Sequence, residues 1–161
     1  ENILRIGSTG ALQPQVNIRD IVVGQGACTD SAWATQYHLP GTFAPIADYT
    51  MLRTCVETAE QLGLSYHVGN LLSSDRFYGD DGDMPDGWKA NNAWAKMGVL
   101  AVEMEAAALY MNAARAGKRA LAICTVSDQL VRQEFTTSEE RQTGFTQMMQ
   151  LALETAIKLE K

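Results

Sequence analysis

The fold of this chain is decided by residues 99–128, which read VLAVEMEAAALYMNAARAGKRALAICTVSD. A short apolar run ends in Glu103 and Glu105, an alanine-rich helical segment follows, and a second apolar run ends in Ser127 and Asp128. The pattern predicts strand, helix and strand, with acids at the carboxyl ends of both strands. Ligands of α/β sheets bind at this edge. Packing explains such carboxylates poorly, because Asp and Glu are rarely buried without partners.

The length indicates one domain over residues 1–161, and the composition limits the kinds of partner that the chain can bind. The net charge is −6 and no basic stripe is visible, so we expect neither nucleic acid nor an anionic membrane as a partner. No apolar run approaches the roughly 20 residues of a membrane span. The three cysteines lack CxxC spacing and indicate reduced core thiols in a cytoplasmic protein. With two histidines and no His/Cys cluster, no metal site is expected.

The remaining pattern extends the same alternation along the chain. We expect strands at residues 3–6, 17–27 and 66–72, helices at residues 48–62 and 88–97, and a last helix from about residue 138 to 159. Together with the central stretch, this order predicts an α/β fold with a mixed or mostly parallel sheet. Because the first strand has no lead-in, the sequence is expected to start within a domain.

Residues 7–10, Gly-Ser-Thr-Gly, predict a tight loop after the first strand, with backbone amides that can face an anion. Arg5 lies near the end of that strand and needs a counter-ion, because an unpaired buried charge is costly. A phosphate or a carboxylate would supply one, and Arg5 with the Ser8 hydroxyl forms a sensible oxyanion set. The alternative is an ordinary glycine turn beside an arginine with a protein partner.

Three later features leave alternatives open. Phe77 and Tyr78 either stack on a flat ligand ring or close the edge of the core. Residues 79–87 are rich in Asp and Gly, but they lack the EF-hand spacing, so a solvated loop is favoured over a calcium site. Thr137 and Glu140 predict a capping box. Arg141 then lies in the first helical turn, where the dipole favours acids, so it has either a specific partner or ordinary solvent exposure.

Four motifs resemble those of the nucleoside phosphorylase superfamily in order and approximate spacing. They are RIGSTG at residues 5–10, VEMEA at 102–106, TVSD at 125–128 and ERQ at 140–142. Within that superfamily the chain looks like the bacterial-type, hexameric purine nucleoside phosphorylases. The resemblance implies a three-layer α/β sandwich with a mixed, mostly parallel central sheet flanked by helices. It also implies that an N-terminal portion carrying further phosphate-binding residues is absent.

The same resemblance implies an activity and partners. The reaction is phosphorolysis of purine (2′-deoxy)ribonucleosides to the free base and (deoxy)ribose 1-phosphate, in cytoplasmic purine salvage. Inorganic phosphate is the co-substrate, and no metal or organic cofactor is implied. The expected assembly is a homo-hexamer, built as a trimer of dimers.

The resemblance also assigns roles to single residues. Asp128 matches the acid that protonates purine N7, so it must carry a proton when it acts, and Arg141 matches the arginine that swings toward it. Three groups of binding residues follow: Glu103, Met104 and Glu105 for the ribose; Thr9, Gly10, Phe77, Val102 and Ser127 for the base; Arg5 and Ser8, with the loop amides, for phosphate.

Three other functions compete with this one. Uridine phosphorylases share the glycine loop and the Glu-Met-Glu motif but lack the Ser-Asp pair. Methylthioadenosine/adenosylhomocysteine nucleosidases share both acidic motifs but use water, and they lack the arginine ahead of Gly-Ser, so Arg5 and Arg141 favour a phosphorylase. A non-catalytic fragment with an incomplete phosphate site is the third alternative.

Overall fold

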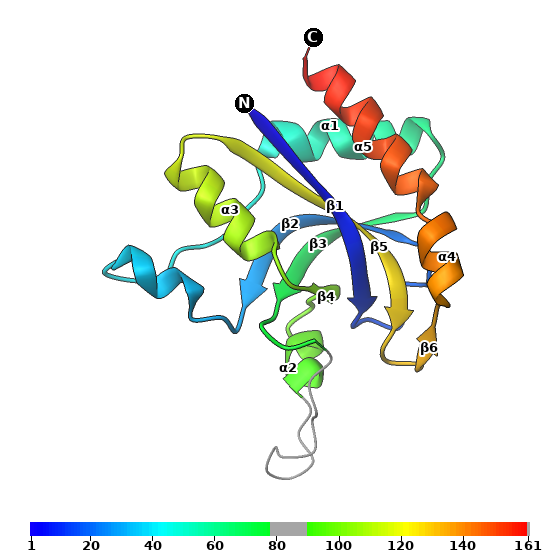
Figure 1. Cartoon of the computed structure of the whole chain (residues 1–161), viewed down its shortest axis with the longest axis horizontal. Coiled ribbons are helices and arrows are strands. Elements are labelled where there is room, and N and C mark those ends of the chain that lie inside the picture. The colour runs from blue at the N-terminus through cyan, green and yellow to red at the C-terminus, as the bar shows by residue number, and fades with distance from the viewer. Residues whose placement is uncertain (78–89, 161) are drawn as a thin grey trace.

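The computed structural model describes residues 1–77 and 90–160, and it has the predicted alternation of strands and helices (Figure 1). The elements in chain order are β1 (Asn2–Ala11), β2 (Ile21–Thr29), the 3-10 helix η1 (Trp33–Tyr37), α1 (Tyr49–Gln61), β3 (Tyr66–Ser73), α2 (Ala90–Lys96), β4 (Ala101–Glu103), α3 (Ala106–Arg115), β5 (Arg119–Gln129), β6 (Glu134–Phe135), α4 (Ser138–Thr143) and α5 (Thr146–Leu159).

The strands form a mixed sheet that closes on itself. Its order is β1-β4-β3-β2-β5-β6, and β1 pairs a second time, with β5, so that β1 to β5 make a ring. The pairs β1–β5, β2–β3 and β3–β4 are parallel, whereas β1–β4, β2–β5 and β5–β6 are antiparallel. The mixed α/β sheet is as predicted. The closed ring differs from the open central layer of the expected three-layer sandwich.

Helices cover both faces of the neighbouring strands β2 and β5, because side chains alternate along each strand. On β5, Leu121 and Ile123 pack into the core shared with α1 and α5, whereas Ala122 and Cys124 pack into the core shared with α3. Figure 1 shows α1 and α5 side by side, with α3 apart from them. The buried Tyr110 of α3 ties its helix to two strands, donating to the Gly24 carbonyl at 2.6 Å and accepting from the Ala122 amide at 3.0 Å.

Helix α1 follows the sequence pattern closely. Asp48 caps it by accepting the Met51 N–H at 2.9 Å, and Gly63 just beyond its end has a φ of 65°, in the left-handed region that favours glycine. The buried face includes Met51 and Cys55, in line with the amphipathic pattern. The three cysteines are free, and Cys28 is only half-buried, so it differs from the expected core thiol.

Two local expectations are wrong. Residues 7–10 are not a loop but part of β1, which pairs with β5 along its whole length and carries an irregularity between Thr9 and Gly10. The expected single last helix is broken into α4 and α5 at Gly144, whose N–H bonds the Glu140 carbonyl at 2.7 Å.

Other expectations fall partly outside the structure. The acidic stretch at residues 79–87 and Tyr78 lie outside the described residues, and the helix expected at 88–97 is described from residue 90 onward. Among the helices of the described parts, none combines the length and apolar character that crossing a bilayer requires.

Candidate active site

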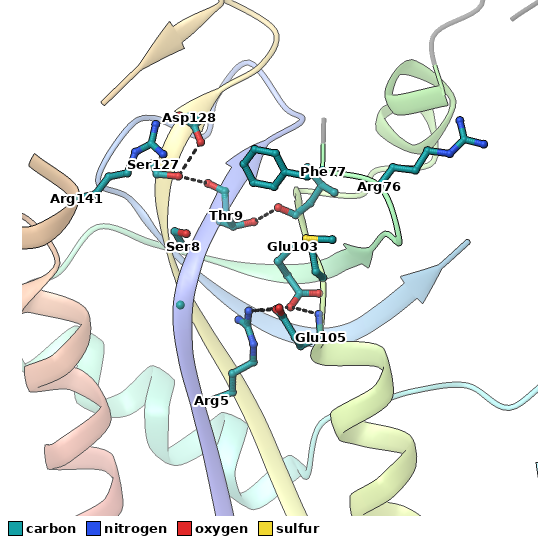
Figure 2. Close-up of a pocket in the computed structure, with 13 residues that line it drawn as sticks. Arg5, Ser8, Thr9, Arg76, Phe77, Glu103, Glu105, Ser127, Asp128 and Arg141 are labelled. Atoms are coloured by element: carbon teal, nitrogen blue, oxygen red, sulfur yellow. Dashed lines mark hydrogen bonds and ion pairs between the residues drawn. The ribbon is translucent and has the colours of Figure 1, made fainter. Parts of the chain in front are cut away.

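A pocket of about 330 Å³ opens where the ends of β4 and β5 lie beside residues 5–9 of β1 (Figure 2). Its lining contains every predicted site residue except Gly10, which lies opposite Val102 of β4 and Asp128 of β5 in the sheet. Gly7 and Arg76 also line the pocket, and Arg76 was not predicted. A cation directly before Phe77 at a strand end was the available signal for it, but its guanidinium points away from the acids in Figure 2.

Strand β1 joins the two acidic ends of the pocket. Thr9 donates its hydroxyl to the Val102 carbonyl of β4 at 2.7 Å, and its own carbonyl oxygen lies 3.4 Å from the Ser127 hydroxyl oxygen. Val102 directly precedes Glu103, and Ser127 directly precedes Asp128. The Thr9 hydroxyl is therefore used within the protein, and the residue contributes little surface to the pocket because it is 3% exposed.

Glu103 is the last residue of β4, just before α3, and is 4% exposed. Its carboxylate accepts the amide protons of Glu105 and Ala106, each at 2.9 Å, and the Ser73 hydroxyl at 2.5 Å. Ser73 in turn accepts the Ala107 amide at 2.8 Å. A carboxylate at a helix N-terminus satisfies orphan N–H groups and complements the helix dipole. Glu103 therefore stabilises the β4–α3 corner, the connection between Glu103 and Ala106 that contains Glu105.

Arg5 lies between the acids of this corner. Its guanidinium pairs with the Glu105 carboxylate, lies 3.3 Å from the Glu103 carboxylate, and donates to the Cys124 sulfur at 3.3 Å. Burial disfavours the charged guanidinium, but Cys124 and the two carboxylates outweigh it and raise the pKa of Arg5. Its counter-ions in this structure are carboxylates, one of the two kinds that the sequence allowed.

The three charged groups differ in their access to solvent. The Glu105 side chain is 59% exposed, whereas those of Arg5 and Glu103 are 20% and 1% exposed. Burial raises the pKa of Cys124 to about 12, so its thiol stays protonated. Glu105 is therefore the acid at this end whose oxygens a ligand can reach, and Ser8, exposed on β1, lies on the same wall.

Asp128 forms the other end of the pocket and is 2% exposed. Its carboxylate accepts the Ser127 hydroxyl at 2.8 Å and lies 3.3 Å from the Arg141 guanidinium. The expected conflict between Arg141 and the helix dipole disappears, because α4 is only six residues long and Arg141 falls in its last turn. Of the two alternatives for Arg141, the structure shows the specific partner.

Apolar groups lie between the two charged ends. Phe77 is 70% exposed and Met104 is 42% exposed, and both line the pocket with Val102. Exposed apolar side chains inside a concave polar site are typical of a surface that a flat or hydrophobic ligand covers. Each end of the pocket therefore has a carboxylate beside a guanidinium, and apolar surface lies between the two ends.

The chain belongs to the phosphorylase superfamily, whose family model matches residues 1–159. It is therefore an enzyme of the nucleoside phosphorylase or nucleosidase type, active in nucleoside metabolism. The pocket between β1 and the ends of β4 and β5 is the candidate place for that chemistry.

Proposed function

We propose that this enzyme catalyses phosphorolysis of purine (2′-deoxy)ribonucleosides, giving the free purine base and (deoxy)ribose 1-phosphate. The observation that carries the proposal is the separation of two acids in one pocket. Asp128 is buried beside Arg141, whereas Glu105 is exposed beside Arg5. One acid is suited to a proton transfer away from water, and the other to binding hydroxyl groups.

The leaving purine needs a proton, because cleavage of the glycosidic bond leaves negative charge on the ring. Asp128 supplies it to purine N7 in its protonated form. The Arg141 guanidinium then stabilises the carboxylate that remains, because an adjacent cation favours the charged form. Phe77, Met104 and Val102 supply the apolar surface against which base and sugar lie.

The sugar and the nucleophile use the opposite end of the pocket. Glu105 accepts hydrogen bonds from the ribose hydroxyls, and Glu103 holds Glu105 in place, since its own oxygens are occupied by the protein's donors. Arg5 and Ser8 hold inorganic phosphate, and alignment of the nucleophile with the anomeric carbon lowers the barrier. We further propose a cytoplasmic hexamer, a trimer of dimers, that needs neither metal nor organic cofactor.

One observation favours a second candidate function, the hydrolytic methylthioadenosine/adenosylhomocysteine-type nucleosidase. Arg5 already has two carboxylate neighbours, so a phosphate anion must compete with Glu105 for its guanidinium. Water, which is neutral, meets no such competition. The two functions differ in the nucleophile and agree on the role of Asp128.

The test is cleavage of inosine and adenosine with and without inorganic phosphate, following free base and ribose 1-phosphate. We expect strict dependence on phosphate. Cleavage without phosphate would establish the nucleosidase instead, and absence of cleavage in both conditions would contradict both functions.

A matched pair of variants tests the acid. Asp128→Asn should reduce adenosine turnover by about 10²- to 10⁴-fold, the usual size of a general-acid contribution. Asp20→Asn changes another buried aspartate, which lies outside the pocket lining, and should keep turnover near that of the wild type. Unchanged adenosine turnover in Asp128→Asn would remove Asp128 from the mechanism.

A further inference from the structure

We propose that the hydroxyl of Thr136 is a positioning group that holds the Arg141 guanidinium against Asp128 during the reaction. This inference rests on the proposed function, in which Arg141 stabilises the Asp128 carboxylate. The need for such a group is visible in the structure, because the Arg141 side chain is 42% exposed and long arginine side chains lose much rotamer freedom when fixed. A single 3.3 Å contact with Asp128 does not define its orientation.

Thr136 is bonded to both Arg141 and Ser127, the residue before Asp128, and is 7% exposed. Its hydroxyl donates to the Ser127 carbonyl at 2.9 Å and accepts the Arg141 Nε–H at 3.2 Å, which uses its donor and one acceptor site. Its backbone carbonyl accepts a second guanidinium N–H at 3.1 Å, and its amide donates to the same Ser127 carbonyl at 3.0 Å. The guanidinium is thus fixed at two atoms.

Thr136 is held by Ser127, the residue that directly precedes the acid Asp128. The Ser127 carbonyl accepts hydrogen bonds from both the hydroxyl and the amide of Thr136. The Ser127 hydroxyl donates to the Asp128 carboxylate at 2.8 Å. Because Thr136 and Asp128 are both bonded to Ser127, a displacement of β5 carries the acid and the guanidinium together. The pair is therefore tied to β5 as well as to the short helix α4, which carries Arg141.

A separate set of contacts fixes the position of α4 itself. Glu140 and Thr137 form the capping box, and the Glu140 carboxylate also lies 3.2 Å from the Arg19 guanidinium. The Arg19 amide donates to the Val126 carbonyl of β5 at 2.9 Å. These contacts fix the backbone of the helix, whereas Thr136 fixes the side chain that reaches the pocket. The two devices are therefore separable by mutation.

The test compares Thr136→Val, Thr136→Ser and Thr58→Val in the phosphorolysis assay. Valine keeps the shape of Thr136 and removes its hydroxyl, so we expect kcat to fall about tenfold, equivalent to about 1.4 kcal/mol, with KM changed less than about twofold. Thr136→Ser should restore kcat. Thr58 is the matched control: it is 1% exposed, and its hydroxyl also donates to a carbonyl and accepts from a cation, Lys158.

A double-mutant cycle shows whether Thr136 acts through Arg141. In the Arg141→Ala background, Thr136→Val should reduce kcat by less than about twofold, because the guanidinium that it positions is gone. A full tenfold loss in that background would overturn the inference, as would an equal loss in Thr58→Val or a failure of serine to rescue.

A measurement without substrate separates this inference from the proposed function. In the spectrum of ¹⁵N-arginine-labelled protein, we expect a protected Arg141 Nε–H signal in the wild type and in Thr136→Ser, assigned by its loss in Arg141→Lys. Thr136→Val should lose that protection, and an unchanged signal would refute the positioning role. If the wild type cleaves no nucleoside but the signal behaves as expected, the proposed function fails while the placement of Arg141 stands.

Discussion

The sharpest prediction concerns Glu103, which the structure separates from Glu105 although both belong to the same motif. Replacing Glu103 with Gln should destabilise the fold, whereas replacing Glu105 with Gln should leave stability nearly unchanged and impair nucleoside binding. The physical difference is burial, because Glu103 is 4% exposed and the Glu105 side chain is 59% exposed. If both carboxylates faced solvent, Glu103→Gln and Glu105→Gln would be expected to change stability by similar amounts.

The magnitude follows from the contacts of the Glu103 carboxylate. It accepts two backbone amides of the β4–α3 corner and the Ser73 hydroxyl, and it lies 3.3 Å from Arg5. Hydrogen bonds to a charged group contribute roughly 1.5–3 kcal/mol and neutral ones roughly 0.5–1.5 kcal/mol. The charge at a partly buried helix N-terminus adds up to about 2 kcal/mol. Because Gln keeps one acceptor oxygen, we expect a loss of about 3 kcal/mol.

The assay is urea unfolding followed by far-ultraviolet circular dichroism. With a slope of about 2 kcal/mol per molar urea, Glu103→Gln should lower the midpoint by about 1.5 M. Glu105→Gln removes one exposed ion pair and should lower the free energy of unfolding by less than about 1 kcal/mol. Its KM for inosine should rise, because the reachable sugar-binding oxygens are lost.

The opposite pattern would refute this reasoning. If Glu103→Gln unfolds at the wild-type midpoint but binds nucleoside weakly, the carboxylate is a sugar ligand and does not hold the corner. If Glu105→Gln is the unstable variant, the assignment of the two acids is reversed.

Two further predictions concern the surroundings of the pocket. A Cβ added at Gly144 would lie 2.5 Å from the Glu140 carbonyl oxygen. Gly144→Ala should therefore shift α4, lower the free energy of unfolding by about 1–3 kcal/mol and reduce turnover. An unchanged urea midpoint and an unchanged turnover rate would show that the helix break tolerates a side chain. Hydrogen bonds from Asn17, His67 and Ser65 outweigh burial and lower the pKa of Asp20, so its contribution to stability is complete above about pH 4 and is lost as the pH falls through the lowered value. The stability of Asp20→Asn should therefore depend less on pH below about 4 than that of the wild type, and equal slopes in acid-titrated urea unfolding would contradict this.

Much of the fold was predictable, because local signals dominate these segments. The capping box of Thr137 and Glu140, the helix at residues 48–62, the strand at 66–72 and the strand that ends near Asp128 appear in the structure with boundaries close to those expected. In each case hydrophobic periodicity and capping chemistry favour the same element. The order of the main strands and helices follows from these signals, whereas η1, β6 and the break between α4 and α5 do not.

Long-range pairing was not predictable in the same way. Residues 7–10 have the composition of a loop, but pairing with β5 keeps them in an extended strand. The closure of the ring depends on contacts between β1 and strands about 90 to 120 residues later, which no local pattern encodes. The break at Gly144 was missed for a different reason, since one glycine within an apolar periodicity is ordinarily tolerated.

The candidate site was predicted as a set of residues but not as an arrangement. The pattern of acids at strand ends was sufficient to name Glu103, Glu105 and Asp128 together. It did not show that Glu103 is occupied by the backbone or that Arg5 pairs with carboxylates, because burial and side-chain direction depend on the packed corner. Thr136 carried no signal beyond its place before a capping residue.

The closure of the ring by β1 has a consequence for how the enzyme folds. β1 pairs in parallel with β5, with Asn2 opposite Arg119, so its main partner is synthesised more than a hundred residues after it. Contacts of such sequence separation carry a large loop-closure entropy and form late, which slows folding. The walls of the pocket come from these same strands, so catalytic competence should be among the last properties that the folding chain acquires. Refolding followed by nucleoside binding should then lag behind refolding followed by helix content.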